Sequence, residues 1–595
     1  MSTTGTCNER AAAALLDELW RCGVREVCIS PGGRSTPLAV ALARDSRLRP
    51  WVITDERSSA FFALGAAVAS GNPVAAVCTS GTAAANFLPA AVEAFWSEVP
   101  LLLVTADRPP ELRDCGAPQT IRQDGLFGRH VKWGTELATP DADVPFEPHV
   151  RAAACRAVGV AMTAPRGPVH LNVPYREPLL ADATTRAAPP PDPTPAARTH
   201  EHAFTTVHPP RLIAADTAIT DFAARAPGAC GIVVCGPRIP ETDAGAIVAL
   251  ASALGWPILA DPLSGLRHGP HDRSGVVDAY DVLLRDPSFA TRHQPLLVLR
   301  FGAAPTSKPL SRFLGALAAE QTLVTTSAAW PDPELAVARV VMGEGGDFCR
   351  RVLESCSRAA GADAHWLGSW TTATRAVRAT IDGLLAAGSE VFEGAIAQHI
   401  TASLPAGALL MVGNSMPVRD IDTFVASSGR TLRMVANRGA NGIDGVLSSA
   451  LGMAAVHPGA TCLLLGDLSF LHDVGALQIA ARHALDLCVV VANNDGGGIF
   501  SYLPQATLGE VFEPFFGTPH GIALEPAVRM CGGAYTLAPS LAALDDALRA
   551  QAGGSGLRVI EVPTRREYNV TRHRDIVACA LAAAHGEPRE VARAS

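Results

Sequence analysis

The amino-acid sequence predicts an α/β protein with three doubly wound parallel-sheet domains. Short runs rich in β-branched residues alternate with longer stretches rich in alanine and leucine, the pattern of βαβ units with helices on both faces of a sheet. The chain has 595 residues, whereas a single hydrophobic core stops growing at roughly 250–300 residues. A segment rich in proline and alanine at 183–204 has no periodicity, which indicates a linker between two such blocks.

The breaks in this pattern predict the domain boundaries. Residues 1–182 are expected to form the first α/β domain, 205–350 a central α/β domain and 389–595 a third, with a linker at 183–204 and a helical connector at 351–388. Strands are expected at Val24–Ser30, Trp51–Thr54, Val74–Thr79 and Leu101–Thr105, then at Gly231–Cys235, Pro257–Ala260 and Leu296–Phe301, and finally at Ala408–Val412, Leu432–Ala436, Thr461–Leu465, Leu487–Ala492 and Leu557–Val562.

Composition excludes several classes of protein. The net charge of −8 gives no basic surface for nucleic acid, and no apolar stretch reaches the 18 or so residues that span a bilayer. The sequence MSTTGTCNER at the start lacks the basic and apolar regions of a secretion signal. The 14 cysteines include no C-x-x-C pair, so their spacing indicates buried thiols in a reducing compartment instead of a metal centre. We therefore expect a cytoplasmic protein with no nucleic-acid partner and no membrane insertion.

Polar residues follow two apolar strands of the third domain. The strand at Thr461–Leu465 runs into Gly466-Asp467, and Asn494 comes 27 positions after Asp467, directly behind the next strand. Because ligands of parallel sheets bind beyond the carboxyl ends of the strands, we expect these two side chains to lie side by side. Carboxylate, amide and carbonyl oxygens are ligands that Mg²⁺ prefers, and the glycines at 496–498 let the backbone approach a phosphate closely. Either motif alone would be an ordinary turn.

This Gly-Asp and Asn-Asn pair resembles the signature of the thiamine-diphosphate enzymes. The resemblance implies that Asp467, the Asn494 side chain and the Gly496 carbonyl hold Mg²⁺ or Mn²⁺ on the cofactor diphosphate. It also implies that the first domain binds the pyrimidine ring of the cofactor. There Glu56, in the sequence Asp-Glu-Arg after the second strand, would hydrogen-bond the aminopyrimidine and act in proton transfer. An isolated Asp-Glu would otherwise be a surface turn.

Longer stretches narrow the resemblance to one family. CISPGGRSTPL, ITDERSSAFFALG, TADRPPELRDCGAPQTIRQ, GNSMPVRDID, NRGANGIDG and NNDGGGIFSYLPQ resemble the 2-succinyl-5-enolpyruvyl-6-hydroxy-3-cyclohexene-1-carboxylate synthases of menaquinone and phylloquinone biosynthesis. These matches run in order through the first and third domains, while the central domain matches chiefly through PTSK. The resemblance implies a transferase that decarboxylates 2-oxoglutarate and adds the succinyl carbanion 1,4 to isochorismate. It also implies a homodimer or tetramer, with each active site between the first domain of one subunit and the third domain of another.

The two substrates each carry two carboxylates, so a site for both needs several cations in fixed positions. The planar fork of arginine suits a carboxylate, although a single arginine is more often part of a solvated ion pair. By resemblance, Gln119 contacts reaction intermediates and Ile443 props the cofactor in its bent shape. The substrate-binding residues implied by the resemblance, besides Gln119, are Arg34, Arg108, Lys308, Ser415, Arg419, Arg438, Ile499, Phe500 and Leu503. For Ile443 and the three apolar members of this set, ordinary core packing is the alternative.

Three positions depart from the family pattern. Gly33 stands where the family usually has serine, Pro118 where it often has asparagine, and Pro309 where some members have arginine. Each puts one secondary substrate contact in doubt. None of them alters the residues expected to hold the cofactor.

Two other functions stay open at this point. The first is another thiamine-diphosphate lyase, such as an acetolactate-type synthase or a 2-oxoacid decarboxylase, which would turn over pyruvate without isochorismate. The second is a degenerate paralogue that binds without catalysis, against which the intact Glu56, Asp467 and Asn494 argue.

Overall fold

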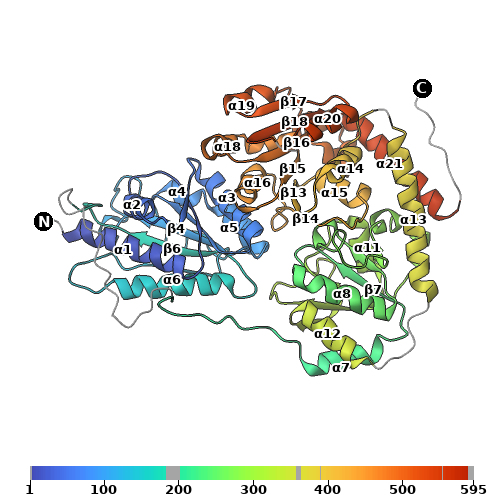
Figure 1. The fold of residues 1–595 in the computed structure, drawn as a ribbon, viewed down its shortest axis with the longest axis horizontal. Helices are drawn as coiled ribbons and strands as arrows, with labels where there is room; N and C mark the ends of the chain where they lie inside the picture. Colours follow the sequence, from blue (N-terminus) through green and yellow to red (C-terminus); the bar gives the residue numbers. More distant parts are fainter. Residues whose placement is uncertain (1–2, 182–201, 357–363, 389, 552–553, 587–595) are drawn as a thin grey trace.

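The computed structural model describes residues 3–181, 202–356, 364–388, 390–551 and 554–586. Figure 1 shows three α/β units, with the first at one end of the molecule and the central and third units beside each other. Each unit contains one six-stranded sheet, and every described strand pair in these sheets is parallel. The predicted fold class of three doubly wound parallel sheets is confirmed. The predicted linker at 183–204 lies almost wholly outside the described residues, and the domain boundaries stay a prediction.

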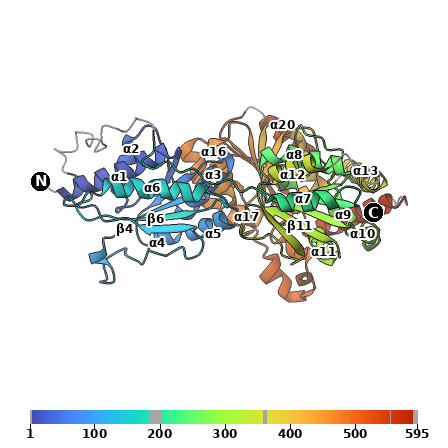
Figure 2. The ribbon, with the colours of Figure 1, turned by 90° about the horizontal axis from the view of Figure 1, so that it is seen from below.

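The first sheet has the strand order β2-β1-β3-β4-β6-β5. Figure 2 shows α1, α2 and α6 on one face of this sheet and α4 and α5 on the other. The strands are β1 Glu26–Ile29, β2 Arg49–Val52, β3 Val74–Cys78, β4 Leu101–Asp107, β5 Trp133–Glu136 and β6 Val169–Pro174, and the helices are α1 Thr3–Arg21, α2 Thr36–Arg44, α3 Glu56–Ser70, α4 Thr82–Ala85, α5 Leu88–Trp96, η1 Pro110–Leu112 and α6 Glu147–Met162.

The central sheet has the order β12-β11-β10-β7-β8-β9, and two helices, α12 and α13, then lead to the third unit. The strands are β7 Gly231–Cys235, β8 Ile258–Ala260, β9 Val276–Val277, β10 Leu297–Phe301, β11 Glu320–Thr325 and β12 Val337–Met342, and the helices are α7 Asp216–Arg225, α8 Glu241–Leu254, η2 Pro262–Ser264, α9 Tyr280–Leu283, α10 Pro287–Arg292, α11 Lys308–Ala316, α12 Gly345–Ser355 and α13 Ala364–Ala386.

The third sheet repeats the topology of the first, with the order β14-β13-β15-β16-β18-β17. Its strands are β13 Ala408–Val412, β14 Leu432–Val435, β15 Thr461–Gly466, β16 Leu487–Asn493, β17 Ala534–Leu537 and β18 Leu557–Pro563. Its helices are α14 Glu393–Ser403, α15 Met416–Phe424, α16 Val446–Val456, α17 Asp467–His472, η3 Val474–Ala476, α18 Leu477–His483, η4 Gly498–Tyr502, η5 Pro504–Thr507, η6 Gly509–Val511, η7 Glu513–Gly517, α19 Glu525–Met530, α20 Leu541–Gln551 and α21 Arg566–Ala584.

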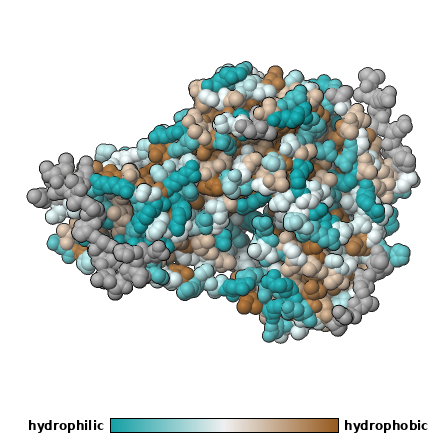
Figure 3. Space-filling view, in the orientation of Figure 1, coloured by the Kyte–Doolittle hydropathy of each residue, from teal (hydrophilic) through white to brown (hydrophobic). Residues whose placement is uncertain are grey.

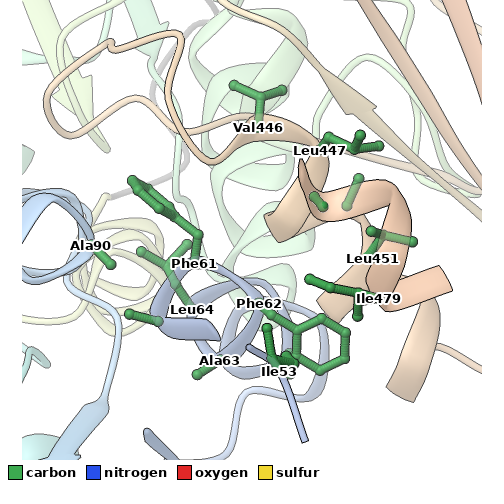
Figure 4. Packing of buried hydrophobic residues seen from close by; sticks show 14 of the residues in the cluster. Ile53, Phe61, Phe62, Ala63, Leu64, Ala90, Val446, Leu447, Leu451 and Ile479 are labelled. Atoms are coloured by element: carbon green, nitrogen blue, oxygen red, sulfur yellow. The ribbon is translucent and has the colours of Figure 1, made fainter. Parts of the chain in front are cut away.

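One hydrophobic core joins the first and third units. Buried side chains of α3, among them Phe62, meet buried side chains of α16, among them Leu451 (Figure 4). Two glycines allow the helix backbones to approach: a Cβ at Gly65 would lie 2.0 Å from the Ser449 carbonyl oxygen, and one at Gly452 would lie 1.9 Å from the Phe62 carbonyl oxygen. The contact therefore depends on the absence of a side chain at both positions.

Buried ion pairs join the central and third units. The Arg267 guanidinium pairs with the Asp422 carboxylate, and both side chains are almost fully buried. Arg378 on α13 donates to Asp278 of the central unit at 2.9 Å and to the Thr423 carbonyl at 2.7 Å. These contacts hold the central unit against α15.

Hydrophobic and hydrophilic residues are mixed over the face of the molecule seen in Figure 3. Among the described residues, no helix combines the length and the hydrophobicity needed to cross a bilayer.

The close approach of α3 and α16 predicts that Gly452→Ala is destabilising, because the new methyl group forces the two helices apart. The expected cost is about 1–3 kcal/mol, the usual range for overpacking. The matched control is Gly383→Ala in α13, where a Cβ meets no atom within 4 Å and alanine should help the helix by up to about 1 kcal/mol. Thermal denaturation of both variants is the measurement. Equal midpoints for the two variants would contradict this account of the helix contact.

Candidate active site

The carboxyl ends of β15 and β16 bring the two predicted metal-binding motifs together. Gly466 at the end of β15 pairs with Ala492 in β16, so Asp467 and Asn494 follow neighbouring strands at the same edge of the sheet. This is the arrangement that the spacing of the two motifs predicts.

Asp467 is a buried carboxylate whose direction is fixed by backbone donors. Its side chain is about 2% exposed. Oδ1 accepts a hydrogen bond from the Leu468 N–H at 2.7 Å, and Oδ2 accepts one from the Gly496 N–H at 2.8 Å. His520 Nε2 lies 3.2 Å from Oδ2. Burial raises the pKa of Asp467 above its usual value despite these donors, because few charges compensate the carboxylate.

Asn494 presents an amide oxygen that has no partner. Its Nδ2 donates to Glu393 Oε1 at 2.8 Å, which fixes the orientation of the amide. Its Oδ1 is buried and accepts no hydrogen bond. A buried carbonyl oxygen without a partner costs free energy, so such an atom in a native fold calls for a ligand.

The glycines after Asn494 are needed for close backbone packing. Gly496 has a φ of +138°, and a Cβ there would lie 2.0 Å from the Gly517 carbonyl oxygen. A Cβ at Gly497 would lie 2.3 Å from the Phe516 carbonyl oxygen. The loop therefore turns its backbone toward Asp467 in a way that other residues could not adopt.

These groups fit a hard divalent cation. The buried carboxylate of Asp467 and the unpartnered Oδ1 of Asn494 supply oxygen ligands, which Mg²⁺ and Mn²⁺ prefer, and the Gly496 N–H holds the Asp467 carboxylate in place. A cation here would satisfy the orphaned oxygen and offset the buried negative charge.

Glu56 is the first residue of α3, which follows β2 after a short turn that ends in Asp55. Asp55 caps the helix by accepting from the Ser58 N–H at 3.0 Å, which leaves the half-buried Glu56 side chain at the helix start. The neighbouring Arg57 donates to the His472 carbonyl at 3.1 Å, at the far end of α17 from Asp467. Within the described part of this single chain, no hydrogen bond or ion pair joins Glu56 to Asp467.

Ile443 lies on the loop before α16 and is 37% exposed. Its carbonyl accepts a hydrogen bond from Ser469 Oγ at 3.1 Å, which ties the loop to α17. A large apolar side chain is therefore held in the open beside the Asp467 helix. Ordinary core packing, the alternative for this residue, does not describe such a position.

In the first unit, the structure brings Arg34, Arg108 and Gln119 to one edge of the sheet. The Arg108 guanidinium donates to Ser80 Oγ, and Gln119 Nε2 donates to the Ser80 carbonyl at 3.0 Å. Gln119 has a φ of +57°, a backbone conformation unusual for this residue type. The buried Arg34 donates to Glu177 at 2.9 Å and to the Tyr175 carbonyl at 3.0 Å. Burial lowers the pKa of Arg108, and the neighbouring Arg34 lowers it further.

In the third unit, Ser415, Arg419 and Arg438 lie beyond β13 and β14. Arg419 donates to the Ser415 carbonyl, and Arg438 Nη1 donates to Asn414 Oδ1 at 2.8 Å. Burial lowers the pKa of both arginines. Ser415 has a φ of +71° and begins α15.

Arg108, Arg419 and Arg438 differ from the buried arginines that support the fold. Arg267 and Arg378 each contact a carboxylate. In the part of the chain that the structure describes, the side-chain hydrogen bonds of Arg108, Arg419 and Arg438 go to neutral oxygens. Partly buried cations whose hydrogen bonds go to neutral groups can bind anionic ligands.

The remaining predicted residues lie on α11 of the central unit and in or beside η4 of the third unit. Lys308 is exposed at the start of α11, two residues after Thr306, whose N–H donates to the buried Asp261 at 2.7 Å. Ile499, Phe500 and Leu503 are half-buried in or beside η4, where the Phe500 ring packs edge-on against Phe516 at 5.5 Å.

Two residues at this site were missed by the sequence analysis. Glu393 at the start of α14 accepts from Asn494, Thr564 and Asn569, all through Oε1. The His520 ring contacts Asp467 through Nε2, and the His520 backbone N–H donates to Asp495 Oδ1 at 2.9 Å. Glu393 lies about 100 positions from Asn494 and belongs to no motif, so only the fold shows the contact.

Comparisons with known proteins agree with this geometry. Three family models match in order: the N-terminal thiamine pyrophosphate-binding domain of thiamine pyrophosphate enzymes at residues 9–126, their middle domain at 211–412 and their C-terminal thiamine pyrophosphate-binding domain at 423–562. A solved structure from Mycobacterium smegmatis, described as a thiamin diphosphate-dependent enzyme, shares the fold with a TM-score of 0.68 and 18% identity, over 93% of this chain and 99% of that one.

Several curated relatives that match nearly the whole chain are named 2-succinyl-5-enolpyruvyl-6-hydroxy-3-cyclohexene-1-carboxylate synthase. The protein from Chloroflexus aurantiacus is 45% identical over 95% of both chains, and the one from Geobacillus thermodenitrificans is 44% identical over 94% of both. The one from Myxococcus xanthus is 42% identical over 99% of both. Together with the three family models, these likenesses show that the chain belongs to the 2-succinyl-5-enolpyruvyl-6-hydroxy-3-cyclohexene-1-carboxylate synthase family of thiamine pyrophosphate enzymes.

Proposed function

We propose that the protein is a transferase of menaquinone biosynthesis that decarboxylates 2-oxoglutarate and adds the resulting four-carbon fragment 1,4 to isochorismate. The products are 2-succinyl-5-enolpyruvyl-6-hydroxy-3-cyclohexene-1-carboxylate and carbon dioxide. The shared name of the relatives supports the product. The observation that carries the proposal is the combination of an unpartnered Asn494 oxygen beside buried Asp467 with arginines that lack carboxylate partners.

The cofactor is thiamine diphosphate, and a divalent metal, Mg²⁺ or Mn²⁺, belongs to the proposal. Asp467, Asn494 Oδ1 and the Gly496 carbonyl would hold the metal. Glu393 accepts from Asn494 Nδ2 and so leaves Asn494 Oδ1 available for the metal. When bound, thiamine diphosphate supplies a nucleophilic carbon that can stabilise the charge left by decarboxylation. The Asp467 carboxylate would bind the metal and, through it, anchor the diphosphate.

Glu56 is assigned a proton-transfer role. Its carboxyl group would hold the proton shared with a pyrimidine ring nitrogen, and the Asp55 cap fixes its place at the start of α3. Ile443, held exposed beside α17, would support the bent cofactor.

The substrate carboxylates would bind to the arginines. Arg34 and Arg108 approach from the first unit and Arg419 and Arg438 from the third. The other residues assigned to substrate are the polar Gln119, Ser415 and Lys308, and the apolar wall of Ile499, Phe500 and Leu503.

The two halves of this site are assigned to different subunits. Because no hydrogen bond or ion pair joins Glu56 to Asp467 within the described part of one chain, we propose a homo-oligomer in which the first unit of one subunit faces the third unit of another. A cytoplasmic location is part of the same proposal.

The proposed function is tested by incubating the protein with thiamine diphosphate, Mg²⁺ and 2-oxoglutarate, with and without isochorismate, and detecting products by mass. We expect the combined product only when both substrates are present. Turnover of pyruvate without isochorismate would instead favour an acetolactate-type synthase or decarboxylase. A protein that binds the cofactor without any turnover would be a non-catalytic paralogue.

Glu56→Gln should lower turnover by about 10²–10⁴-fold, the usual contribution of general acid–base catalysis. Deuterium exchange at C2 of the bound cofactor should slow in parallel, while cofactor binding weakens only modestly. The matched control is Asp55→Asn, which removes the adjacent charge and keeps a good helix cap. A folded Glu56→Gln variant with wild-type C2 exchange would show that Glu56 is only a turn residue.

The proposed subunit arrangement can be tested with the same variant. Mixing Glu56→Gln with Asp467→Ala, each inactive alone, should restore part of the activity, because one of the two sites in a mixed dimer carries both native residues. No recovery after verified subunit exchange would place both residues in the site of one chain.

Arg108→Ala and Arg438→Ala should each lower kcat/KM for substrate while leaving cofactor affinity nearly unchanged. A lost charge-assisted contact costs about 1.5–3 kcal/mol, or roughly 10–150-fold. Steady-state kinetics beside calorimetric titration of thiamine diphosphate separates the two effects. The control is Arg375→Ala on α13, whose side chain contacts only its own helix. A large loss of cofactor affinity would assign these arginines to the diphosphate instead.

A further inference from the structure

A second group of metal-binding side chains lies in the first unit, away from the candidate active site. Within the residues that the structure describes, Glu18, Cys22 and Cys155 form the one group of three histidine, cysteine or acidic side chains whose ligand atoms all lie within 4.8 Å of one another. Glu18 is on α1, Cys22 directly follows that helix, and Cys155 is on α6. The three residues therefore connect two neighbouring helices on one face of the first sheet (Figure 2).

The distance between the two sulfur atoms suits a bridging metal. Cys22 Sγ and Cys155 Sγ are 3.7 Å apart. Two sulfurs at about 2.3 Å from one tetrahedral Zn²⁺ are separated by about 3.7–3.8 Å. A disulfide would require about 2.05 Å. The Cys155 thiol also donates to Glu18 Oε1 at 3.2 Å, and all three ligand atoms lie within 4.8 Å of one another.

Surrounding donors hold the ligand atoms in place. Arg151 donates to Glu18 Oε2 at 2.9 Å, and the Phe204 N–H donates to Glu18 Oε1. The Thr205 N–H donates to Cys155 Sγ at 3.3 Å. Protein metal sites are typically oriented by hydrogen bonds of this kind to the ligand atoms.

Metal binding would not unbalance the charges of this region. The ion pairs of Arg151 with Asp17 and Glu18 already compensate the carboxylates. One dication that replaces two thiol protons would therefore leave the net charge of the region unchanged.

We propose that Glu18, Cys22 and Cys155 bind a thiophilic dication such as Zn²⁺, separate from the metal of the active site. Binding releases the two thiol protons to solvent and forms two metal–sulfur bonds and one metal–oxygen bond to Glu18, with a water molecule as the fourth ligand and no change of oxidation state. Cys22 is partly exposed and gives the ion a path of entry.

The site has a structural role in this proposal. Phe204 and Thr205 lie where the described chain resumes on its way to the central unit, and their N–H groups contact the ligand atoms. The metal therefore fastens α1 and α6 together with the start of this connection. Since it binds only the folded chain, it should raise the thermal midpoint of the protein.

The test is metal binding by the full-length protein, kept reduced with a phosphine and saturated with Mg²⁺ and thiamine diphosphate so that the active-site metal position is filled. Zn²⁺ is titrated against a fluorescent chelator at micromolar free metal. We expect one tightly bound equivalent in the wild type, and its loss in Cys22→Ser and in Cys155→Ser. Cys531→Ser, which alters a partly exposed cysteine in the third unit, is the matched control and should keep the full equivalent.

A second measurement needs no variant. Zn²⁺ should protect Cys22 and Cys155 of the wild type from alkylation, read by peptide mass, without protecting the exposed Cys115. Co²⁺ in place of Zn²⁺ should give the absorption of a tetrahedral thiolate site. The proposal is overturned if the wild type binds no Zn²⁺ beyond the chelator, if binding persists in the Cys22→Ser, Cys155→Ser double variant, or if the purified protein carries a Cys22–Cys155 disulfide and no zinc.

Discussion

The packing of α3 against α16 is the contact on which the candidate site depends. Each of these helices leaves the edge strand of its sheet, β2 or β14, and each begins beside a predicted site residue, Glu56 or Ile443. Because Gly65 and Gly452 allow backbone contact, the two helices form a single rigid core instead of two separate ones. In the proposed oligomer, this core fixes how each chain offers the carboxyl edges of its first and third sheets to the neighbouring subunit.

The site contains a buried carboxylate and partly buried arginines that, among the described residues, form no ion pair with each other or with another Arg or carboxylate. Asp467 receives backbone donors, and its pKa is still raised by burial. Arg108 and Arg438 are held by a hydroxyl and an amide, so the pKa of each is lowered by burial. Burying these charged groups, even partly, costs folding free energy. A cation at Asp467 and anionic substrates at the arginines would offset that cost.

The sequence predicted the interior strands well, since they are continuous apolar runs. It missed the half-exposed edge strands β5, β12 and β17, whose side chains form no such run. It also missed two interior strands, β6 and β11, because buried polar residues such as His170 and Asn172 in β6 and Gln321 in β11 interrupt their patterns. The two-residue edge strand β9 was missed as well.

Site residues could be predicted where they belong to a local sequence pattern, and were missed where only the fold brings them together. Asp467 and Asn494 could be found because both follow buried strands at a readable spacing. Glu393 and His520 reach the site through long-range packing, and the thiols of Cys22 and Cys155 meet only because α1 packs on α6. The role of each site residue stays a prediction until it is measured.

The most direct test of the account is the position of the active-site metal. Crystals grown with thiamine diphosphate and Mn²⁺ locate the metal by anomalous scattering. The account predicts a peak beyond β15 and β16, within roughly 2.0–2.3 Å of an Asp467 carboxylate oxygen, Asn494 Oδ1 and the Gly496 carbonyl oxygen. A cofactor bound with its metal held by other residues, or an Asn494 oxygen still without a partner in that complex, would contradict it.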